Sequence, residues 1–221
     1  MKYGILKIDP PWEKKKGGMR KVRPKQTREL DYPTMEIHSI FNLLDKEIFP
    51  LAKENHCVFL WCIDKYLSDI DNWMFERGYK RHARVIWDKE NGVAPAFTLR
   101  FAHEYLIWYY KGKFMPIAKE WRGKITTVLR EKARQHSRKP ICAYWMIESF
   151  YPDENKLDVF AREKRFGWSV WGNETDKFNA PEFTLASPTF PTEKAINRNS
   201  DIKLNSLSAN SNIGNLKWQD N

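Results

Sequence analysis

Short hydrophobic stretches recur along the chain and are separated by longer polar segments. The stretches rich in β-branched or aromatic residues lie at 3–8, 57–61, 83–87, 105–110, 156–160 and 168–171. Short apolar runs of this composition are typical of strands buried in a sheet. The pattern therefore predicts a strand at each of these places.

An amphipathic segment between the second and third predicted strands indicates a helix. Leu67, Ile70 and Met74 recur there at the spacing that puts them on one helix face. Gly78 follows as a C-terminal stop, because glycine readily takes the left-handed conformation that ends many helices. The sequence therefore predicts a helix that ends just before Gly78.

A second helix is predicted to begin at Pro140, because proline suits the first turn of a helix. Ile141, Tyr144 and Trp145 would face inward from it. Strands that alternate with helices favour a mainly parallel sheet covered on both faces. We therefore expect a three-layer α/β/α fold of the α/β class.

Two polar segments, 13–28 and 119–139, carry many basic side chains and are predicted to be loops. The formal net charge of the chain is +10, which favours a polyanionic partner, because binding to phosphates releases counterions. The candidate phosphate contacts are Lys14, Lys15, Lys16, Arg20, Lys21, Arg134 and Arg138. Solvated loops that only add solubility are the alternative interpretation.

The composition changes after about residue 176, where Asn, Ser, Thr and Pro dominate and bulky apolar groups become rare. Such a composition does not bury enough apolar surface to fold alone. We therefore predict one folded domain over residues 1–175 and a disordered C-terminal tail over residues 176–221.

The three cysteines, Cys57, Cys62 and Cys142, form no CxxC pair. They are interpreted as buried structural thiols, which favours a reducing compartment and argues against a zinc site. No apolar stretch reaches the length of a membrane span, and residues 1–9 lack the form of a secretory signal. The expectation is a soluble cytoplasmic protein without a metal or a membrane partner.

The first predicted strand leads directly into Asp9-Pro10-Pro11-Trp12. Ligands of open α/β sheets bind beyond the carboxyl ends of the strands, so this tetrad lies where chemistry is expected. The two prolines end the strand and have no N–H group. We therefore expect the local carbonyls to face the site without a competing donor.

These residue types suit the methylation of an amino group on a purine. A carboxylate from Asp9 and the carbonyl of Pro10 can accept both N–H bonds of the amine and stabilise the positive charge that develops on it. Trp12 offers a face on which the base can stack, and correct positioning of the reactants supplies much of the remaining catalysis. The alternative is a rigid turn with an aromatic lid, since short motifs also occur by chance.

Further motifs follow the tetrad in a fixed order. They are Tyr32-Pro33-Thr34-Met35, Phe59-Leu60-Trp61, Gly78-Tyr79 with Val85-Ile86-Trp87, His103-Glu104, His136-Ser137-Arg138-Lys139-Pro140, Leu157-Asp158-Val159-Phe160-Ala161-Arg162, and Gly167-Trp168-Ser169-Val170-Trp171-Gly172-Asn173-Glu174. Over residues 3–175 the sequence resembles the MT-A70 methyltransferases. The similarity is closer to the small bacterial and phage members than to the large eukaryotic messenger-RNA enzymes.

The resemblance implies a Rossmann-like class I methyltransferase fold that uses S-adenosyl-L-methionine and has a permuted motif order. The catalytic motif then comes first and much of the cofactor site comes late in the domain, which accounts for the absence of a GxGxxG loop. The implied cofactor contacts are Lys139, Phe160, Arg162, Asn173 and Glu174, with Lys139 at the carboxylate of the cofactor. Tyr32 and Trp61 would border the cavity for the target adenine.

Each implied contact has a structural alternative, since Arg162 would otherwise be a surface arginine and Trp61 an ordinary core residue. His103 and Glu104 are interpreted as structural or as a cavity wall, outside the catalytic set. The adenine end of the cofactor is expected to meet the 162–174 region or another chain, and both a homodimer and a heterodimer stay open. Recognition of a target sequence is expected to be relaxed, or to come from the basic loops or from a partner.

The leading hypothesis is an adenine-specific DNA N6-methyltransferase. DNA is preferred to RNA by analogy with the bacterial and phage members of the family. The alternatives are an RNA adenine N6-methyltransferase and a non-catalytic, nucleic-acid-binding subunit with a methyltransferase fold. Methylation of the N4 amine of cytosine is a further variant.

Overall fold

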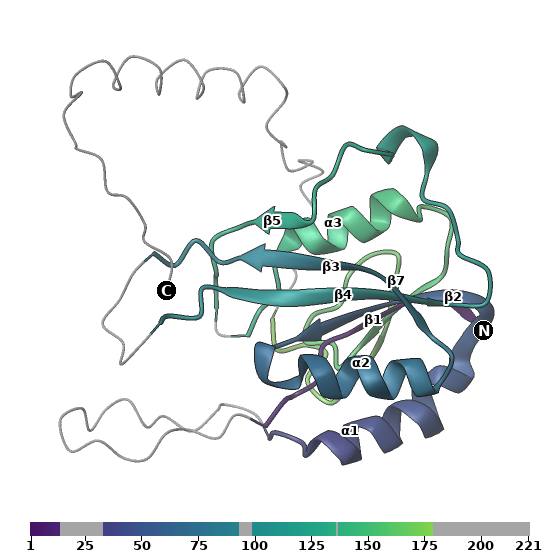
Figure 1. Cartoon of the computed structure of the whole chain (residues 1–221), viewed down its shortest axis with the longest axis horizontal. Coiled ribbons are helices and arrows are strands. Elements are labelled where there is room, and N and C mark those ends of the chain that lie inside the picture. Colours follow the sequence, from purple (N-terminus) through teal and green to yellow (C-terminus); the bar gives the residue numbers. More distant parts are fainter. Residues whose placement is uncertain (14–32, 93–98, 136, 179–221) are drawn as a thin grey trace, which may run out of the picture. The chain divides into compact units, whose positions relative to one another are not determined.

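The computed structural model describes residues 1–13, 33–92, 99–135 and 137–178. These residues build a seven-stranded sheet with the order β5-β3-β4-β2-β1-β6-β7 (Figure 1). The strands are β1 (Tyr3–Ile8), β2 (Ala52–Cys62), β3 (Lys80–Asp88), β4 (His103–Lys111), β5 (Val128–Arg130), β6 (Lys156–Val159) and β7 (Trp168–Trp171). Strand β1 therefore lies near the middle of the sheet.

One strand of the sheet, β4, runs opposite to the others. It pairs antiparallel with both β2 and β3. Strand β1 pairs parallel with β2 and with β6, and the pairs β6–β7 and β3–β5 are parallel too. The carboxyl ends of β1, β2, β6 and β7 therefore meet at one edge of the sheet.

The helices cover both faces of the sheet, so the fold has three layers (Figure 1). Helices α1 (Ile37–Leu43) and α2 (Leu67–Glu76) lie on one face, and α3 (Ile141–Phe150) lies on the other. Short helical turns follow α1 at Leu44–Ile48 and Phe49–Leu51, precede α2 at Asp64–Tyr66, and occur at Lys119–Trp121.

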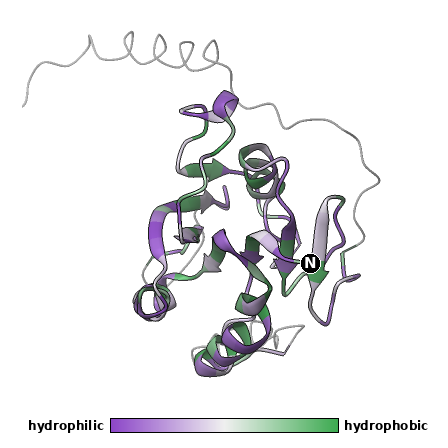
Figure 2. Ribbon diagram, turned by 90° about the vertical axis from the view of Figure 1, so that its right-hand side faces the viewer, coloured by the Kyte–Doolittle hydropathy of each residue, from purple (hydrophilic) through white to green (hydrophobic). Residues whose placement is uncertain are grey.

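Each face of the sheet has its own hydrophobic core, because neighbouring side chains of a strand point to opposite faces. Leu6 and Ile8 of β1 pack with Ile70 of α2. Ile5 packs on the other side, with Ile147 of α3 among its neighbours. Hydrophobic and hydrophilic stretches alternate along the helices that flank the sheet (Figure 2).

The structure confirms the predicted α/β class, the three layers and a strand at every predicted position. It also confirms the first predicted helix, in which Ile70 and Met74 are fully buried and Gly78 follows with φ 77°. The mainly parallel sheet is confirmed as well, with β4 as the exception.

The prediction for helix α3 is partly wrong. Pro140 precedes the helix as its N-cap, with an extended backbone, so it is not in the first turn. Tyr144 is buried as expected, but Ile141 and Trp145 are only half-buried. The deeply buried face consists of Cys142, Ala143, Met146, Ile147 and Phe150. Nearly every position of this short helix is apolar, so its inward face could not be identified from spacing alone.

Two further elements escaped prediction. The segment 119–139, predicted to be a loop, contains strand β5, which pairs with β3 at the edge of the sheet. Three residues are too few to show a period-two pattern. Helix α1 was missed as well, and its first residue follows directly on Glu36, whose side chain caps it.

The remaining expectations concern the cysteines, the tail and the membrane. Cys57, Cys62 and Cys142 are buried and unpaired, as predicted. The predicted tail lies almost wholly outside the described residues, which end at Phe178, and the N–H of Phe178 donates to the carbonyl of Arg162 (2.8 Å). Within the described part of the chain, no helix has the length and apolarity that a membrane span requires.

Candidate active site

The predicted catalytic tetrad lies immediately beyond the carboxyl end of β1. The N–H of Asp9 donates to the carbonyl of Val159 at the end of β6 (3.2 Å), which ties the start of the tetrad to the neighbouring strand. Because side chains alternate along a strand, Asp9 points to the same face as Lys7, the face covered by α3. The carboxylate therefore meets residues from the α3 side of the sheet.

The carbonyls of the two prolines each already accept a hydrogen bond. The N–H of Trp12 donates to the carbonyl of Pro10 (2.8 Å), and the N–H of Met35 donates to that of Pro11 (2.9 Å). The expectation that no donor competes for these carbonyls is therefore wrong. A carbonyl oxygen has two lone pairs, so the oxygen of Pro10 can still accept a second hydrogen bond.

Trp12 is 5% exposed and is held firmly by its surroundings. Its indole N–H donates to the carbonyl of Trp61 (3.0 Å), and its ring lies 5.1 Å from that of Tyr66. The hydroxyl of Tyr66 in turn donates to the carbonyl of Glu13 (2.7 Å). These contacts fix the backbone on both sides of the tetrad.

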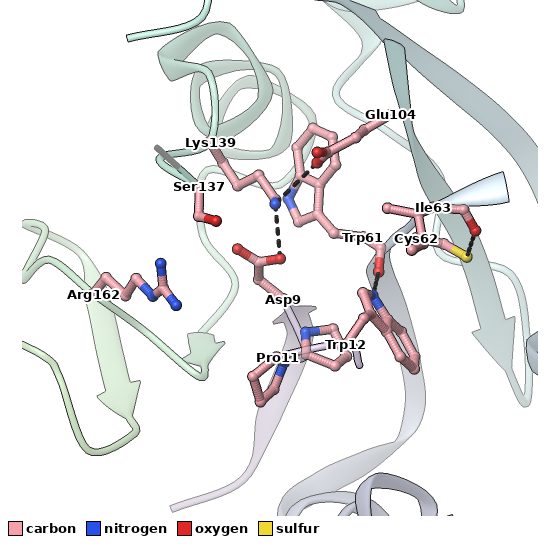
Figure 3. Close-up of a pocket in the computed structure, with 11 residues that line it drawn as sticks. Asp9, Pro11, Trp12, Trp61, Cys62, Ile63, Glu104, Ser137, Lys139 and Arg162 are labelled. Carbon is pink, nitrogen blue, oxygen red and sulfur yellow. Dashed lines mark hydrogen bonds and ion pairs between the residues drawn. The ribbon is translucent and has the colours of Figure 1, made fainter. Parts of the chain in front are cut away.

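A row of alternating charges begins at the carboxylate of Asp9, and Figure 3 shows its members Lys139 and Glu104. The ammonium of Lys139 lies 2.9 Å from Oδ1 of Asp9 and 3.0 Å from Oε2 of Glu104. It also lies 5.3 Å from the centre of the Trp61 ring. Lys89 contacts the other oxygen of Glu104 at 2.7 Å. Glu104, which the sequence places outside the catalytic set, lines a cavity in front of Asp9.

Burial and charge act in opposite directions on this cluster. Burial disfavours the charged form of Glu104, but Lys139 and Lys89 outweigh it and lower the pKa of Glu104 to about 2. Burial also disfavours the ammonium of Lys139, but Asp9 and Glu104 outweigh it and raise the pKa of Lys139. Glu104 and Lys139 are therefore both charged at neutral pH.

The segment that carries Lys139 is held from several sides. The carboxylate of Glu131 accepts the N–H groups of Ile141 and Cys142 (2.9 Å each) and so caps the start of α3. The guanidinium of Arg134 donates to the carbonyl of Lys139 (3.0 Å). Ser137 has a φ of 63°, in the left-handed region. The turn that carries Lys139 is therefore well fixed.

Two of the hollows next to Asp9 are also lined by other residues of the tetrad. The first is a cavity between the tetrad and Lys139, with a volume of about 20 Å³, and its other walls are Trp61, Cys62, Ile63, Glu104, Ser137 and Arg162. The second is an open groove with a volume of about 200 Å³ along the ends of β6 and β7. Asp9, Pro11 and Arg162 line both of them. The tetrad therefore stands at the junction of the two hollows.

The groove brings together most of the predicted cofactor contacts. Its walls include Phe160, Arg162, Asn173 and Glu174, while Lys139 lies in the adjoining cavity. Opposite them, Pro33, Met35 and Leu43 complete the groove. Of these three, Leu43 lies in a helix that was not predicted, whereas Pro33 and Met35 belong to the motif 32–35, to which the sequence assigned no place in a cofactor groove.

The ends of β6 and β7 approach each other closely at the groove. The N–H of Ala161 donates to the carbonyl of Trp171 (3.0 Å). Gly172 follows with φ 156°, and a Cβ atom there would lie 3.0 Å from the nitrogen of Ala161. Phe160 has φ 59°, and Arg162 lies 3.3 Å from Glu174. A glycine at position 172 therefore lets the two strand ends form one continuous wall.

A buried polar network lies next to the groove and was not predicted. The ammonium of Lys7 donates to Asp158 (2.9 Å) and to the hydroxyl of Tyr144 (2.7 Å), and that hydroxyl donates to the other oxygen of Asp158 (2.8 Å). Burial raises the pKa of Asp158 despite the contact with Lys7. Lys7 and Asp158 face each other across the paired strands β1 and β6, a relationship that depends on strand register.

The described basic candidates are engaged within the fold. Arg138 contacts Glu163 at 2.7 Å with a side chain that is 9% exposed, and Arg134 lies 3.5 Å from Glu131. These contacts favour a structural contribution from both, and their binding of phosphate stays a prediction. The candidates Lys14, Lys15, Lys16, Arg20, Lys21 and Tyr32 lie outside the described residues.

Comparisons with known proteins identify the family of this chain. Residues 3–174 match the MT-A70 family. The Type II methyltransferase M.MunI of Mycoplasma sp is 25% identical over 190 residues, which cover 78% of this chain and 78% of that protein. An N(6)-adenosine-methyltransferase MT-A70-like protein of Arabidopsis thaliana is 25% identical over an alignment that covers 94% of this chain and 31% of that protein.

A human relative is matched in the same way. The N(6)-adenosine-methyltransferase catalytic subunit METTL3 is 24% identical over 184 residues, which cover 79% of this chain and 28% of that protein. The chain thus spans less than a third of the length of these plant and human relatives. The family match extends over most of the chain and includes the tetrad, Lys139 and both walls of the groove. The chain therefore belongs to the MT-A70 family of S-adenosylmethionine-dependent methyltransferases.

Proposed function

We propose that this protein transfers a methyl group from S-adenosylmethionine to the N6 amine of adenine in DNA. The observation that carries the proposal is the position of Asp9 at the junction of the cavity and the groove. A residue that must contact both a target base and a methyl donor has to stand between their binding sites. Among the described carboxylates, Asp9 is the one that lines both hollows.

In this proposal the tetrad binds and orients the target amine. The carboxylate of Asp9 accepts one N–H of the amine, and the second lone pair of the Pro10 carbonyl accepts the other. Both acceptors stabilise the positive charge that develops on the nitrogen. Lys139 orients the carboxylate through its contact with Oδ1.

The groove suits S-adenosylmethionine by the chemistry of its walls. The apolar side chains of Met35, Leu43 and Phe160 suit an adenine ring, while Asn173 and Glu174 offer partners for ribose hydroxyls. Gly172 lets the ends of β6 and β7 approach each other closely in this wall. When bound, the cofactor supplies a methyl group on a sulfonium, which is a good leaving group. Lys139 and Arg162 line the hollows beside Asp9 and are the candidate partners of the cofactor's carboxylate, in addition to the carboxylates that they already contact.

The cavity in front of Asp9 has room for about one water molecule, and a purine ring is much larger. Entry of the base therefore requires the side chains around Lys139 and Trp61 to move apart. The cost of extruding a base from a duplex is a few kcal/mol. Contacts between the basic side chains and the phosphate backbone would offset that cost.

DNA is the proposed substrate for two reasons. The sequence resembles the small bacterial and phage members of the family more than the large eukaryotic ones. The alignment with the Type II methyltransferase M.MunI also covers 78% of each protein, so the two chains are similar in extent. RNA is the second candidate, since several relatives are named as N(6)-adenosine-methyltransferases. Assembly with a second chain stays a prediction from the sequence.

Mass spectrometry of nucleosides tests the substrate. DNA and RNA of matched sequence would be incubated with the purified chain and S-adenosylmethionine, then digested and analysed. We expect N6-methyladenine in DNA. Methylation confined to RNA would overturn the choice of DNA, and N4-methylcytosine without methyladenine would overturn the choice of base.

Two variants test the mechanism. Asp9→Ala should abolish methyl transfer, because the amine loses its carboxylate partner, while Asp69→Ala on the exposed side of α2 should leave the rate unchanged. Full activity of Asp9→Ala would contradict the proposed role of the tetrad. Calorimetry with S-adenosylmethionine separates an enzyme from a non-catalytic subunit, which would bind nucleic acid but no cofactor.

A further inference from the structure

Lys89 lies just beyond the end of β3 and is fixed through its backbone. Its N–H donates to the carbonyl of Ala102 (2.9 Å), and its carbonyl accepts the N–H of Ala133 (3.1 Å). The side chain is 19% exposed, and its ammonium lies 5.3 Å from the centre of the Trp87 ring. The backbone of Lys89 is therefore fixed, and its side chain lies against the Trp87 ring.

The ammonium of Lys89 contacts one oxygen of Glu104, and Lys139 contacts the other. The distances are 2.7 Å from Lys89 to Oε1 and 3.0 Å from Lys139 to Oε2. Lys139 in turn lies 2.9 Å from Asp9. The four side chains thus form a row of alternating charges, Lys89–Glu104–Lys139–Asp9, whose formal sum is zero. Only the last member belongs to the tetrad.

We propose that Lys89 is a positioning residue for methyl transfer, which acts through Glu104 and Lys139 on the carboxylate of Asp9. This proposal rests on the proposed function, because it takes Asp9 as the partner of the target amine. By occupying Oε1 of Glu104, Lys89 lets Lys139 share its ammonium between Glu104 and Asp9.

The effect of Lys89 on Asp9 results from the charge balance of a buried site. Without the ammonium of Lys89, two carboxylates would compete for the single ammonium of Lys139. Glu104 is 11% exposed and Asp9 is 15% exposed at the side chain, so water screens this imbalance poorly. Lys139 would then move toward Glu104, and Asp9 would lose its fixed orientation. Replacement of one remote charge thereby disturbs the group that binds the amine.

The alternative is that the Lys89–Glu104 pair only stabilises the fold. The pair Lys53–Glu154 offers a matched control, because it has the same residue types and the same distance of 2.7 Å. Lys53 lies at the start of β2, whereas Trp61 and the cavity lie at the end of that strand. The Lys53–Glu154 side chains are more exposed (41% and 28%) than those of Lys89 and Glu104 (19% and 11%), so Lys53→Gln should cost less stability. A merely structural role of Lys89 would lower the unfolding midpoint but leave the kcat of the folded enzyme unchanged.

The test compares Lys89→Gln, Lys89→Arg and Lys53→Gln with the wild type. The readouts are kcat and KM for an adenine-containing oligonucleotide, the thermal unfolding midpoint, and the pKa of Glu104 from carbon-13 NMR. We expect Lys89→Gln to lower kcat about tenfold with little change in KM for the oligonucleotide, which corresponds to about 1.4 kcal/mol at the transition state. Lys89→Arg should restore most of kcat, and Lys53→Gln should leave it unchanged.

The NMR titration separates failure of this proposal from failure of the proposed function. Lys89→Gln should raise the pKa of Glu104, because one of the two cations that lower it is gone. If the wild type methylates neither DNA nor RNA, the proposed function fails, and the titration still decides whether Lys89 controls the charge of Glu104. An unchanged pKa of Glu104, or a kcat of Lys89→Gln equal to that of Lys53→Gln, overturns the proposal.

Discussion

The ammonium of Lys139 lies 2.9 Å from Oδ1 of Asp9 and joins the end of β1 to the turn before α3. The Lys139 side chain is 10% exposed, and its ammonium also lies 3.0 Å from Oε2 of Glu104. This ion pair connects the proposed catalytic carboxylate to a residue that family resemblance assigns to the cofactor. Several expected outcomes depend on it.

Replacement of Lys139 by Met should be costly for stability. The variant leaves Asp9 and Glu104 as neighbouring buried carboxylates without their shared cation, so we expect the free energy of unfolding to fall by about 3 kcal/mol. Urea denaturation measures this change. Lys164 is a suitable control, because its pair with Asp176 is also 2.9 Å long but both side chains are more than half exposed. Lys164→Met should cost less than about 1 kcal/mol, and equal losses in the two variants would contradict the prediction.

The charge of Glu104 predicts a dependence of stability on pH. Its pKa in the folded protein is about 2, below the ordinary value of 4.5, so its ionisation contributes stability above about pH 4.5. That contribution is lost as the pH falls from about 4.5 to 2. The free energy of unfolding of the wild type should therefore decrease over this range more steeply than that of Glu104→Gln. Parallel slopes, measured by denaturation in urea at several pH values, would count against the ion cluster.

Gly172→Ala should weaken binding of the cofactor. A Cβ at this position meets the backbone of Ala161 at 3.0 and 3.1 Å, so the ends of β6 and β7 must move apart. We expect the Kd for S-adenosylmethionine to rise about tenfold, which corresponds to about 1.4 kcal/mol. Gly123→Ala provides a control, since its φ is 73° but no atom lies within 4 Å of the added Cβ. Calorimetry should show an unchanged Kd for the control, and a similar rise in both variants would point to general backbone strain.

Replacement of Arg138 should change thermal stability, whereas replacement of Arg130 should change DNA binding. Arg138 is 9% exposed and contacts Glu163 at 2.7 Å, whereas Arg130 is 66% exposed and lies 3.8 Å from Asp88. Arg138→Gln should therefore lower the thermal unfolding midpoint, because it leaves a buried carboxylate with one cation fewer. Arg130 is an exposed cation of the basic segment 119–139, so Arg130→Gln should leave the midpoint unchanged and remove about one phosphate contact from the salt dependence of DNA binding. Fluorescence anisotropy at several salt concentrations measures the second effect, and a reversed pattern would make Arg138 the phosphate contact.

The sequence by itself determined the parts of this protein that depend on local patterns. Short apolar runs located the predicted strands, and helical spacing with Gly78 located α2. The tetrad could be assigned to the end of a strand because Asp9 follows directly on an apolar run. These features are encoded within a few neighbouring residues, so periodicity and composition reveal them.

Only the tertiary structure decided which distant residues meet. The contact of Lys139 with both Asp9 and Glu104 depends on the place of β4 in the sheet and on the turn before α3. The wall of Pro33, Met35 and Leu43 and the contact of Lys7 with Asp158 depend equally on how separate elements pack. Strand order and register result from the packing of the whole chain, and no local period in the sequence records them. For that reason the tetrad could be identified from the sequence. The charged side chains and the groove walls around it could be identified only from the folded structure.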